Sequence, residues 1–316
     1  MKIFITGGTG FIGQHLVKEL AKENHQIYYL TRRQSGNETF NYKNVIPVPG
    51  ILNDIKTYQN IFEKNFDVVY HLAAIAGQKW GISEEDYQKI NVEVTENLLK
   101  ACYDKIKRFI FCSSINALSD NNFLWDPYGK SKYQAEQMVK YYGKLGLTTV
   151  IIRPAIVYGP GDTRGMMLKM LKLIKEKKYR LIGQGNNLAP FVYIDDLVKA
   201  FVRALTCPDN TTYEIIGPGK TSFKEVLETA ANLLNIKKPK KSVPVWLAKL
   251  TAQISELTAS LFNIEPLITK HRVDFLIKER NFPQEKVRRE LNLTPQITFS
   301  DGLAKTIHWY KENNYL

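Results

Sequence analysis

Residues 6–13 read Thr-Gly-Gly-Thr-Gly-Phe-Ile-Gly and separate two segments with different hydrophobic patterns. The preceding residues 2–5 are mostly apolar, which predicts a buried strand, whereas the following residues have helical spacing. Gly7, Gly10 and Gly13 recur every third residue, as expected where a tight turn and close packing exclude side chains. Backbone amides at the start of the helix would then face an anion. The stretch therefore predicts a strand, a phosphate-binding turn and a helix.

The next apolar run, residues 26–30, predicts a second strand that leads into Thr31, Arg32 and Arg33. An NAD-binding turn has an acidic residue about 20 residues beyond its glycines, where the carboxylate binds the ribose 2′-hydroxyl. Two guanidinium groups in that place suit a 2′-phosphate through charge-assisted bonds. The sequence thus predicts NADP as cofactor, with NAD as the alternative. A solvated basic loop is the structural alternative.

Strands and helices alternate through the first part of the chain. Apolar runs at 45–48, 67–74 and 107–112 predict three further strands, and segments with helical patterns lie between them. This alternation predicts an α/β fold with a doubly wound parallel sheet, whose ligands bind at the carboxyl ends of the strands. The run at 107–112 would deliver Ser113 and Ser114 to that edge.

Composition excludes several classes of protein. The chain has 316 residues and a formal net charge of +13, but its 44 Lys and Arg residues are scattered and form no nucleic-acid-binding module. Its three cysteines have no metal-binding spacing and fit a reducing cytoplasm, so no metal is expected. We also expect neither a signal peptide nor a membrane-spanning segment.

Tyr128 and Lys132 lie four residues apart in a segment with a helical pattern, so they share one helical face. A nearby ammonium favours the phenolate and should lower the tyrosine pKa from about 10, which suits acid/base chemistry. A hydroxyl from Ser114 would hold a substrate oxygen against the tyrosine, while the lysine bonds the nicotinamide ribose. Such a pair is common on ordinary helices, but its position after a glycine turn and strand-end serines favours a catalytic site.

Together these motifs resemble an extended short-chain dehydrogenase/reductase, the group that includes sugar-nucleotide epimerases and dehydratases, dihydroflavonol reductases and 3β-hydroxysteroid dehydrogenases. The matching stretches are TGGTGFIG (6–13), HLAA (71–74), SSINA (113–117), YGKSK (128–132), RPAIVYGPGD (153–162) and FVYIDDLVKA (191–200). The resemblance implies a Rossmann-type domain with Ser114, Tyr128 and Lys132 as catalytic residues. The predicted cofactor-binding residues are Gly7, Thr9, Gly10, Phe11, Ile12, Gly13, Arg32, Arg33, Leu52, Leu72, Ala73, Ala74, Asn91, Tyr128, Lys132 and Pro154.

Two positions depart from the sugar-nucleotide pattern. Those enzymes commonly have Asn where this chain has Ile156 and Arg where it has Ala189, and both side chains hold the nucleotide diphosphate. We therefore predict an oxidoreductase that transfers a hydride between nicotinamide and a secondary alcohol or ketone. The alternative is a nucleotide-sugar epimerase or dehydratase that uses the same site with transient hydride transfer. A cofactor-binding protein without turnover is disfavoured by the intact catalytic residues.

The domain boundaries follow from where the alternating pattern ends. We expect a dinucleotide-binding domain over 1–160, with 190–216 returning to it. A smaller mixed α/β lobe, built from 161–189 and 217–316, would bind a small-molecule substrate. The resemblance also implies a homodimer that pairs through helices at about 84–103 and 128–144.

A long apolar helix is expected near residues 244–262. On it Trp246, Leu250, Ile254, Leu257 and Leu261 recur at three- and four-residue steps, which is typical of one buried face. We predict that this face packs in the core of the smaller lobe, and we expect no contact with a membrane surface.

Overall fold

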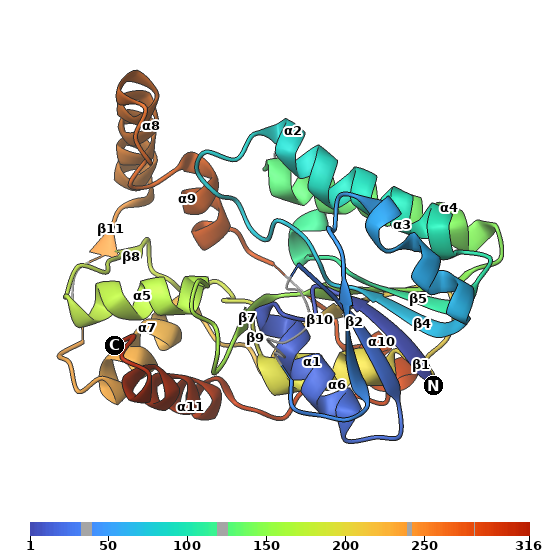
Figure 1. Cartoon of the computed structure of the whole chain (residues 1–316). Coiled ribbons are helices and arrows are strands. Elements are labelled where there is room, and N and C mark those ends of the chain that lie inside the picture. Colours follow the sequence, from blue (N-terminus) through green and yellow to red (C-terminus); the bar gives the residue numbers. More distant parts are fainter. Residues whose placement is uncertain (33–39, 119–125, 239–241, 281) are drawn as a thin grey trace. The chain divides into compact units, whose positions relative to one another are not determined.

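The computed structural model describes the chain except for residues 33–39, 119–125, 239–241 and 281 (Figure 1). The chain divides into two compact units, each assembled from three segments. Unit 1 consists of Met1–Ala155, Ile194–Ile215 and Gln284–Thr294, and unit 2 of Ile156–Tyr193, Ile216–Pro283 and Pro295–Leu316.

Unit 1 is built on a parallel sheet of seven strands in the order β10-β6-β5-β4-β1-β2-β3. The strands are β1 (Lys2–Thr6), β2 (Gln26–Thr31), β3 (Val45–Pro49), β4 (Phe66–His71), β5 (Ile106–Cys112), β6 (Thr148–Pro154) and β10 (Thr211–Ile215). The strand order reverses between β1 and β4, and helices cover both faces of the sheet (Figure 1). The predicted doubly wound parallel sheet is therefore confirmed.

The helices of unit 1 form two layers (Figure 1). Helices α1 (Phe11–Ala21) and α6 (Ile194–Arg203) pack together on one face of the sheet, and α3 (Val94–Cys102) and α4 (Pro127–Lys144) pack together on the other. The remaining elements are α2 (Glu84–Tyr87), a π-helical turn η3 (Gln88–Glu93), the 3₁₀ turns η1 (Ile55–Thr57), η2 (Gln59–Lys64) and η4 (Ile115–Ala117), and α10 (Glu285–Leu291) beside β10.

A large apolar core lies between the sheet and α3 and α4. Phe4, Val69 and Phe111 point into it from three neighbouring strands, and Leu98 and Val139 meet them from the helices. Successive strand residues face opposite sides of a sheet, so Ile3 and Ile5 are buried on the opposite face from Phe4. Burial on both faces explains why these strands read as nearly continuous apolar runs.

Unit 2 contains two small parallel sheets with helices around them. One pairs β7 (Ile156–Tyr158) with β9 (Phe191–Tyr193), and the other pairs β8 (Leu181–Ile182) with β11 (Ser242–Val243). The helices are α5 (Met166–Lys175), α7 (Phe223–Leu233), α8 (Val245–Phe262), α9 (Lys270–Ile277) and α11 (Phe299–Glu312). Among the described residues, no helix is long and apolar enough to span a membrane.

The units differ from the expected domains at their boundaries. Gln284–Thr294 were expected in the smaller lobe but belong to unit 1, where α10 packs against the edge strand β10. Residues 156–160 and 190–193 were expected in the dinucleotide-binding domain but belong to unit 2. The prediction that α8 buries its large apolar side chains is wrong. Trp246 and Ile254 are exposed, and α8 instead buries Ala248, Ala252 and Ala259.

Candidate active site

The predicted cofactor-binding residues that the structure describes lie in unit 1 at the carboxyl edge of the sheet. Thr6 ends β1 and the glycine turn follows it, Leu72 to Ala74 follow β4, and Pro154 ends β6. Parallel strands end at a common edge, which is where α/β sheets bind their ligands. Arg32 follows β2 and is exposed, whereas Arg33 lies outside the described residues. Leu52 follows β3, and its carbonyl accepts a hydrogen bond from the Tyr58 hydroxyl.

Gly7 and Gly13 occupy positions where a side chain would clash. Gly7 has a φ of +74°, and a Cβ on it would lie 2.6 Å from the Ala73 amide nitrogen. A Cβ on Gly13 would overlap the carbonyl oxygen of Gly7, and the Gly10 amide donates to that same oxygen at 3.0 Å. The turn therefore holds the start of α1 close to the ends of β1 and β4.

The start of α1 suits the pyrophosphate of a dinucleotide. Gly10 occupies the N-cap position, and along this fully described helix no side chain caps the first turn and no acidic residue lies in it. The first amides of a helix lack partners within it and carry partial positive charge. The backbone of residues 10–13 thus fits the phosphates of a nicotinamide dinucleotide, and the fold places them at the strand edge.

Buried polar side chains connect the strand ends to the neighbouring helices. The ring nitrogens of His71 lie 2.6 Å from the Thr6 hydroxyl and 2.9 Å from the Thr95 hydroxyl. Burial, and secondarily the charge of Lys132, lower the pKa of His71 to about 3. His71 is therefore neutral and links β1, β4 and α3.

Asn91 lies in the π-helical turn, a local departure from α-helix that frequently marks functional sites. The side-chain oxygen of Asn91 accepts a hydrogen bond from the Ile75 amide at 2.8 Å, and its side-chain nitrogen donates to the Ile75 carbonyl at 3.1 Å. The same nitrogen donates to the Ser131 hydroxyl at 2.9 Å. Ser131 in turn donates to the Tyr128 carbonyl. Asn91 thus joins the loop after β4 to the first turn of α4.

Ser114 and Tyr128 meet at the sheet edge. Ser114 follows β5, and its hydroxyl accepts from the Asn116 amide at 3.1 Å. Burial raises the pKa of Tyr128, and the neighbouring Ser114 side chain offsets only part of that effect. The expectation that a nearby ammonium lowers this pKa is therefore not met, because burial disfavours the charged phenolate and is the largest influence on this group.

Lys132 lies one turn beyond Tyr128 and is only 2% exposed. Its ammonium nitrogen lies 4.2 Å from the centre of the Phe111 ring. Burial lowers the pKa of Lys132 to about 8, although Cys112 and Glu136 act in the opposite direction. At pH 7 this position therefore holds a cation in a dry environment, where its field on neighbouring groups is strong.

A buried ion-pair network that the sequence analysis did not identify lies next to these residues. Glu136, one turn beyond Lys132, is fully buried and accepts from Arg153 at 2.8 and 2.6 Å. It also accepts from the Ser113 hydroxyl at 2.5 Å, and Arg153 bonds Glu214 at 2.9 Å. The network ties the end of β5 to β6, β10 and α4, and its members Ser113 and Glu136 are close in sequence to Ser114 and Lys132. Its only sequence signal is an acidic residue four positions after Lys132.

Gly129 explains how α4 approaches Ser114. A Cβ at this position would lie 2.6 Å from the Asn116 carbonyl oxygen. Asp126, the N-cap residue of α4, accepts a hydrogen bond from the Gly129 amide at 2.5 Å. The missing side chain allows the first turn of α4 to lie against η4, which brings the Tyr128 hydroxyl to Ser114.

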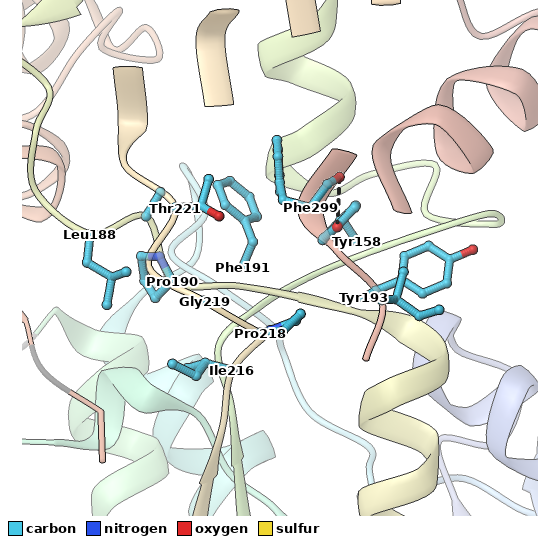
Figure 2. A pocket seen from close by; sticks show the side chains of 13 residues that line it. Tyr158, Leu188, Pro190, Phe191, Tyr193, Ile216, Pro218, Gly219, Thr221 and Phe299 are labelled. Atoms are coloured by element: carbon cyan, nitrogen blue, oxygen red, sulfur yellow. Dashed lines mark hydrogen bonds between the residues drawn. The ribbon is translucent and has the colours of Figure 1, made fainter. Parts of the chain in front are cut away.

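Unit 2 contains a narrow pocket beside the paired strands β7 and β9 (Figure 2). It encloses about 20 Å³ and is lined by aromatic, aliphatic and backbone groups, with no charged side chain among its lining residues. Tyr158 and Phe191 form part of its wall, and Ala189 lines it. The Ile156 amide donates to the Pro190 carbonyl at 2.8 Å, so the two positions that depart from the sugar-nucleotide pattern are neighbours.

The parallel sheet, the glycine turn and the paired Ser114 and Tyr128 define a nucleotide-binding α/β enzyme. The chain belongs to the NAD-dependent epimerase/dehydratase family, whose model matches residues 3–216. Its relatives include reductases, epimerases and decarboxylases of the extended short-chain dehydrogenase/reductase type, so the predicted superfamily and enzyme class are confirmed.

Similar proteins carry out different reactions. The chain is 26% identical to a 2-alkyl-3-oxoalkanoate reductase from Stenotrophomonas maltophilia, covering 96% of this chain and 98% of the relative. It is 25% identical to a UDP-N-acetyl-α-D-glucosaminuronate decarboxylase from Bacillus cytotoxicus, covering 98% of each. The crystal structure of UDP-glucuronic acid 4-epimerase from Bacillus cereus in complex with NAD has the same fold, with a TM-score of 0.75, 24% identity and 99% coverage of both chains.

Proposed function

We propose that this enzyme reduces a ketone, or oxidises the corresponding secondary alcohol, with NADP as the preferred cofactor. The observation that carries this proposal is the close packing of the first turn of α4, which carries Tyr128, against η4 next to Ser114, with the buried Lys132 one turn further along α4. A bound nicotinamide cofactor supplies or accepts the hydride. The residues of this chain then have to hold the substrate oxygen and move one proton.

Ser114 and Tyr128 would divide that task. In this proposal the Ser114 hydroxyl donates to the substrate oxygen and holds it beside the phenol. Because burial raises the pKa of Tyr128, the phenol carries its proton at neutral pH and can give it to the carbonyl oxygen as the alkoxide develops. The positive charge of Lys132 favours the phenolate that this transfer leaves behind. A protonated Tyr128 therefore suits reduction of the ketone.

Position 189 supports an uncharged substrate group. Ala189 stands where sugar-nucleotide enzymes commonly have an arginine that neutralises a diphosphate. One relative is named as a 2-alkyl-3-oxoalkanoate reductase, and a 3-oxoalkanoate with an alkyl substituent is an example of a ketone next to alkyl chains. We therefore propose an apolar ketone rather than a nucleotide sugar as substrate.

Stoichiometry separates this proposal from the alternative. The full chain would be incubated with NADPH or NADH and a series of 3-oxo acids and cyclic ketones, while the absorbance of reduced nicotinamide is followed. We expect one NADPH consumed per alcohol formed, and slower turnover with NADH. A sugar-nucleotide epimerase would instead convert UDP-glucose to UDP-galactose without net change in the cofactor, and that result would replace the present proposal.

A further inference from the structure

The outward face of α8 is an apolar surface that no described part of the chain covers. Five of its residues form a stripe that we call the seam, and they are between 38% and 80% exposed: Leu247, Leu250, Ile254, Leu257 and Leu261. The opposite face carries alanines that pack against α9, which lies beside α8 (Figure 1). The helix is therefore held to unit 2 by small residues and presents its large ones outward.

The spacing of the seam is that of a helix–helix contact. Its residues are separated by 3, 4, 3 and 4 positions, which is the a/d pattern of a heptad repeat. From first to last they extend over about 21 Å, or nearly four helical turns. The pattern is also nearly symmetric about Ile254, with Leu250 and Leu257 close on either side and Leu247 and Leu261 seven positions away on each. A surface with this symmetry can face a copy of itself across a twofold axis.

The charges on α8 favour a second copy over other occupants. The positions that border the seam are uncharged: Trp246, Thr251, Gln253, Thr258 and Ser260. Lys249 and Glu256 are the charged residues of this helix, and both contact the α9 side, through Asp274 and the Lys270 amide. Two chains with a net charge of +13 repel one another, and a neutral face adds no further repulsion where they meet. An anionic membrane would instead favour a rim of lysines or arginines, which α8 does not have.

We propose that two copies of this chain associate through α8, with seam packed against seam around Ile254. The contact differs from the pairing through helices near 84–103 and 128–144 that the family resemblance implies. Where both form, they would build a tetramer with two kinds of interface.

Sedimentation of the full chain over a dilution series tests the proposal. We expect reversible self-association, and we expect Ile254→Lys to raise the dissociation constant at least tenfold because each copy would place a charge at the centre of the contact. Leu173→Lys is the matched control, since Leu173 lies on α5 of the same unit and is 43% exposed against 54% for Ile254. It should leave the dissociation constant within twofold of the parent value.

Cross-linking provides a second measurement that does not depend on a charged substitution. The native cysteines are buried, and Ile254→Cys should form a disulfide between copies under mild oxidation while Leu173→Cys does not. A parent chain that sediments as a monomer at all concentrations would overturn the proposal, and so would equal masses for the parent and Ile254→Lys. Co-sedimentation of a monomeric parent with vesicles of anionic phospholipid, lost in Ile254→Lys, would assign the seam to a membrane surface instead.

Discussion

Gly129→Ala should damage the site more than it damages the fold. The added Cβ would lie 2.6 Å from the Asn116 carbonyl oxygen, whereas ordinary contact requires about 3.4 Å or more. Relief therefore needs a shift of about 0.8 Å between the start of α4 and η4. Tyr128 and Ser114 lie on the two sides of that contact. A displacement of about 1 Å at reacting groups can cost on the order of 100-fold in rate, so we expect kcat/KM to fall by about that factor.

The expected effect on stability is smaller because two terms oppose each other. Alanine in place of glycine gains up to about 1 kcal/mol in a helix, and overpacking costs about 1–3 kcal/mol. Urea unfolding should show a loss of at most about 3 kcal/mol by this account.

Gly143→Ala is a matched control at the other end of α4. Its Cβ would approach a side-chain oxygen of Asn210 at 2.8 Å, which can move without displacing the site. Ketone reduction with NADPH is the assay for both variants. Wild-type kcat/KM in Gly129→Ala, or an equal loss in Gly143→Ala, would refute the steric argument.

Three further substitutions probe the same unit. Lys132→Met should abolish ketone reduction yet stabilise the fold at pH 7 by about 1–3 kcal/mol, because it removes a desolvated charge. The pKa of Lys132 is lowered to about 8 in the folded chain, so between about pH 8 and 10.5 the unfolded chain binds more protons than the folded one. The parent chain therefore gains stability as pH rises through this range, and the extra stability of Lys132→Met should shrink. Urea unfolding at pH 7 and at pH 9.5 measures the difference. Glu136→Gln breaks a buried ion pair and should cost about 3–5 kcal/mol of unfolding free energy, with Glu214→Gln, whose side chain is 25% exposed, as the milder comparison. Arg32→Ala should reduce the preference for NADPH over NADH about tenfold or more, as measured by nucleotide fluorescence titration.

The ligand-binding edge of the parallel sheet and the glycine turn could be predicted because their causes are local. A phosphate-binding turn needs glycine where Cβ atoms would clash, and Gly7 and Gly13 are in such positions. Tyr128 and Lys132 share a face through helical spacing alone, and Ser114 reaches them because parallel strands end at a common edge.

The features that escaped prediction depend on contacts between distant segments. Arg153 pairs with Glu136 and Glu214, which lie 17 and 61 positions away in the sequence, and no periodic pattern predicts such a pair. For α8, the spacing identified the residues that share a face, but periodicity does not say whether a face is covered. For Tyr128, burial was underestimated, and burial determines the sign of the pKa shift.

Tyr128→Phe tests the central claim most directly. The substitution removes the phenolic hydroxyl and keeps the ring, so cofactor binding and folding should change little while the proton donor is lost. We expect stoichiometric oxidation of NADPH by the best ketone substrate to fall at least 100-fold, as is usual for loss of a general acid. The nucleotide fluorescence titration should match that of the parent. Undiminished NADPH oxidation by Tyr128→Phe would contradict the assignment of this tyrosine as the proton donor.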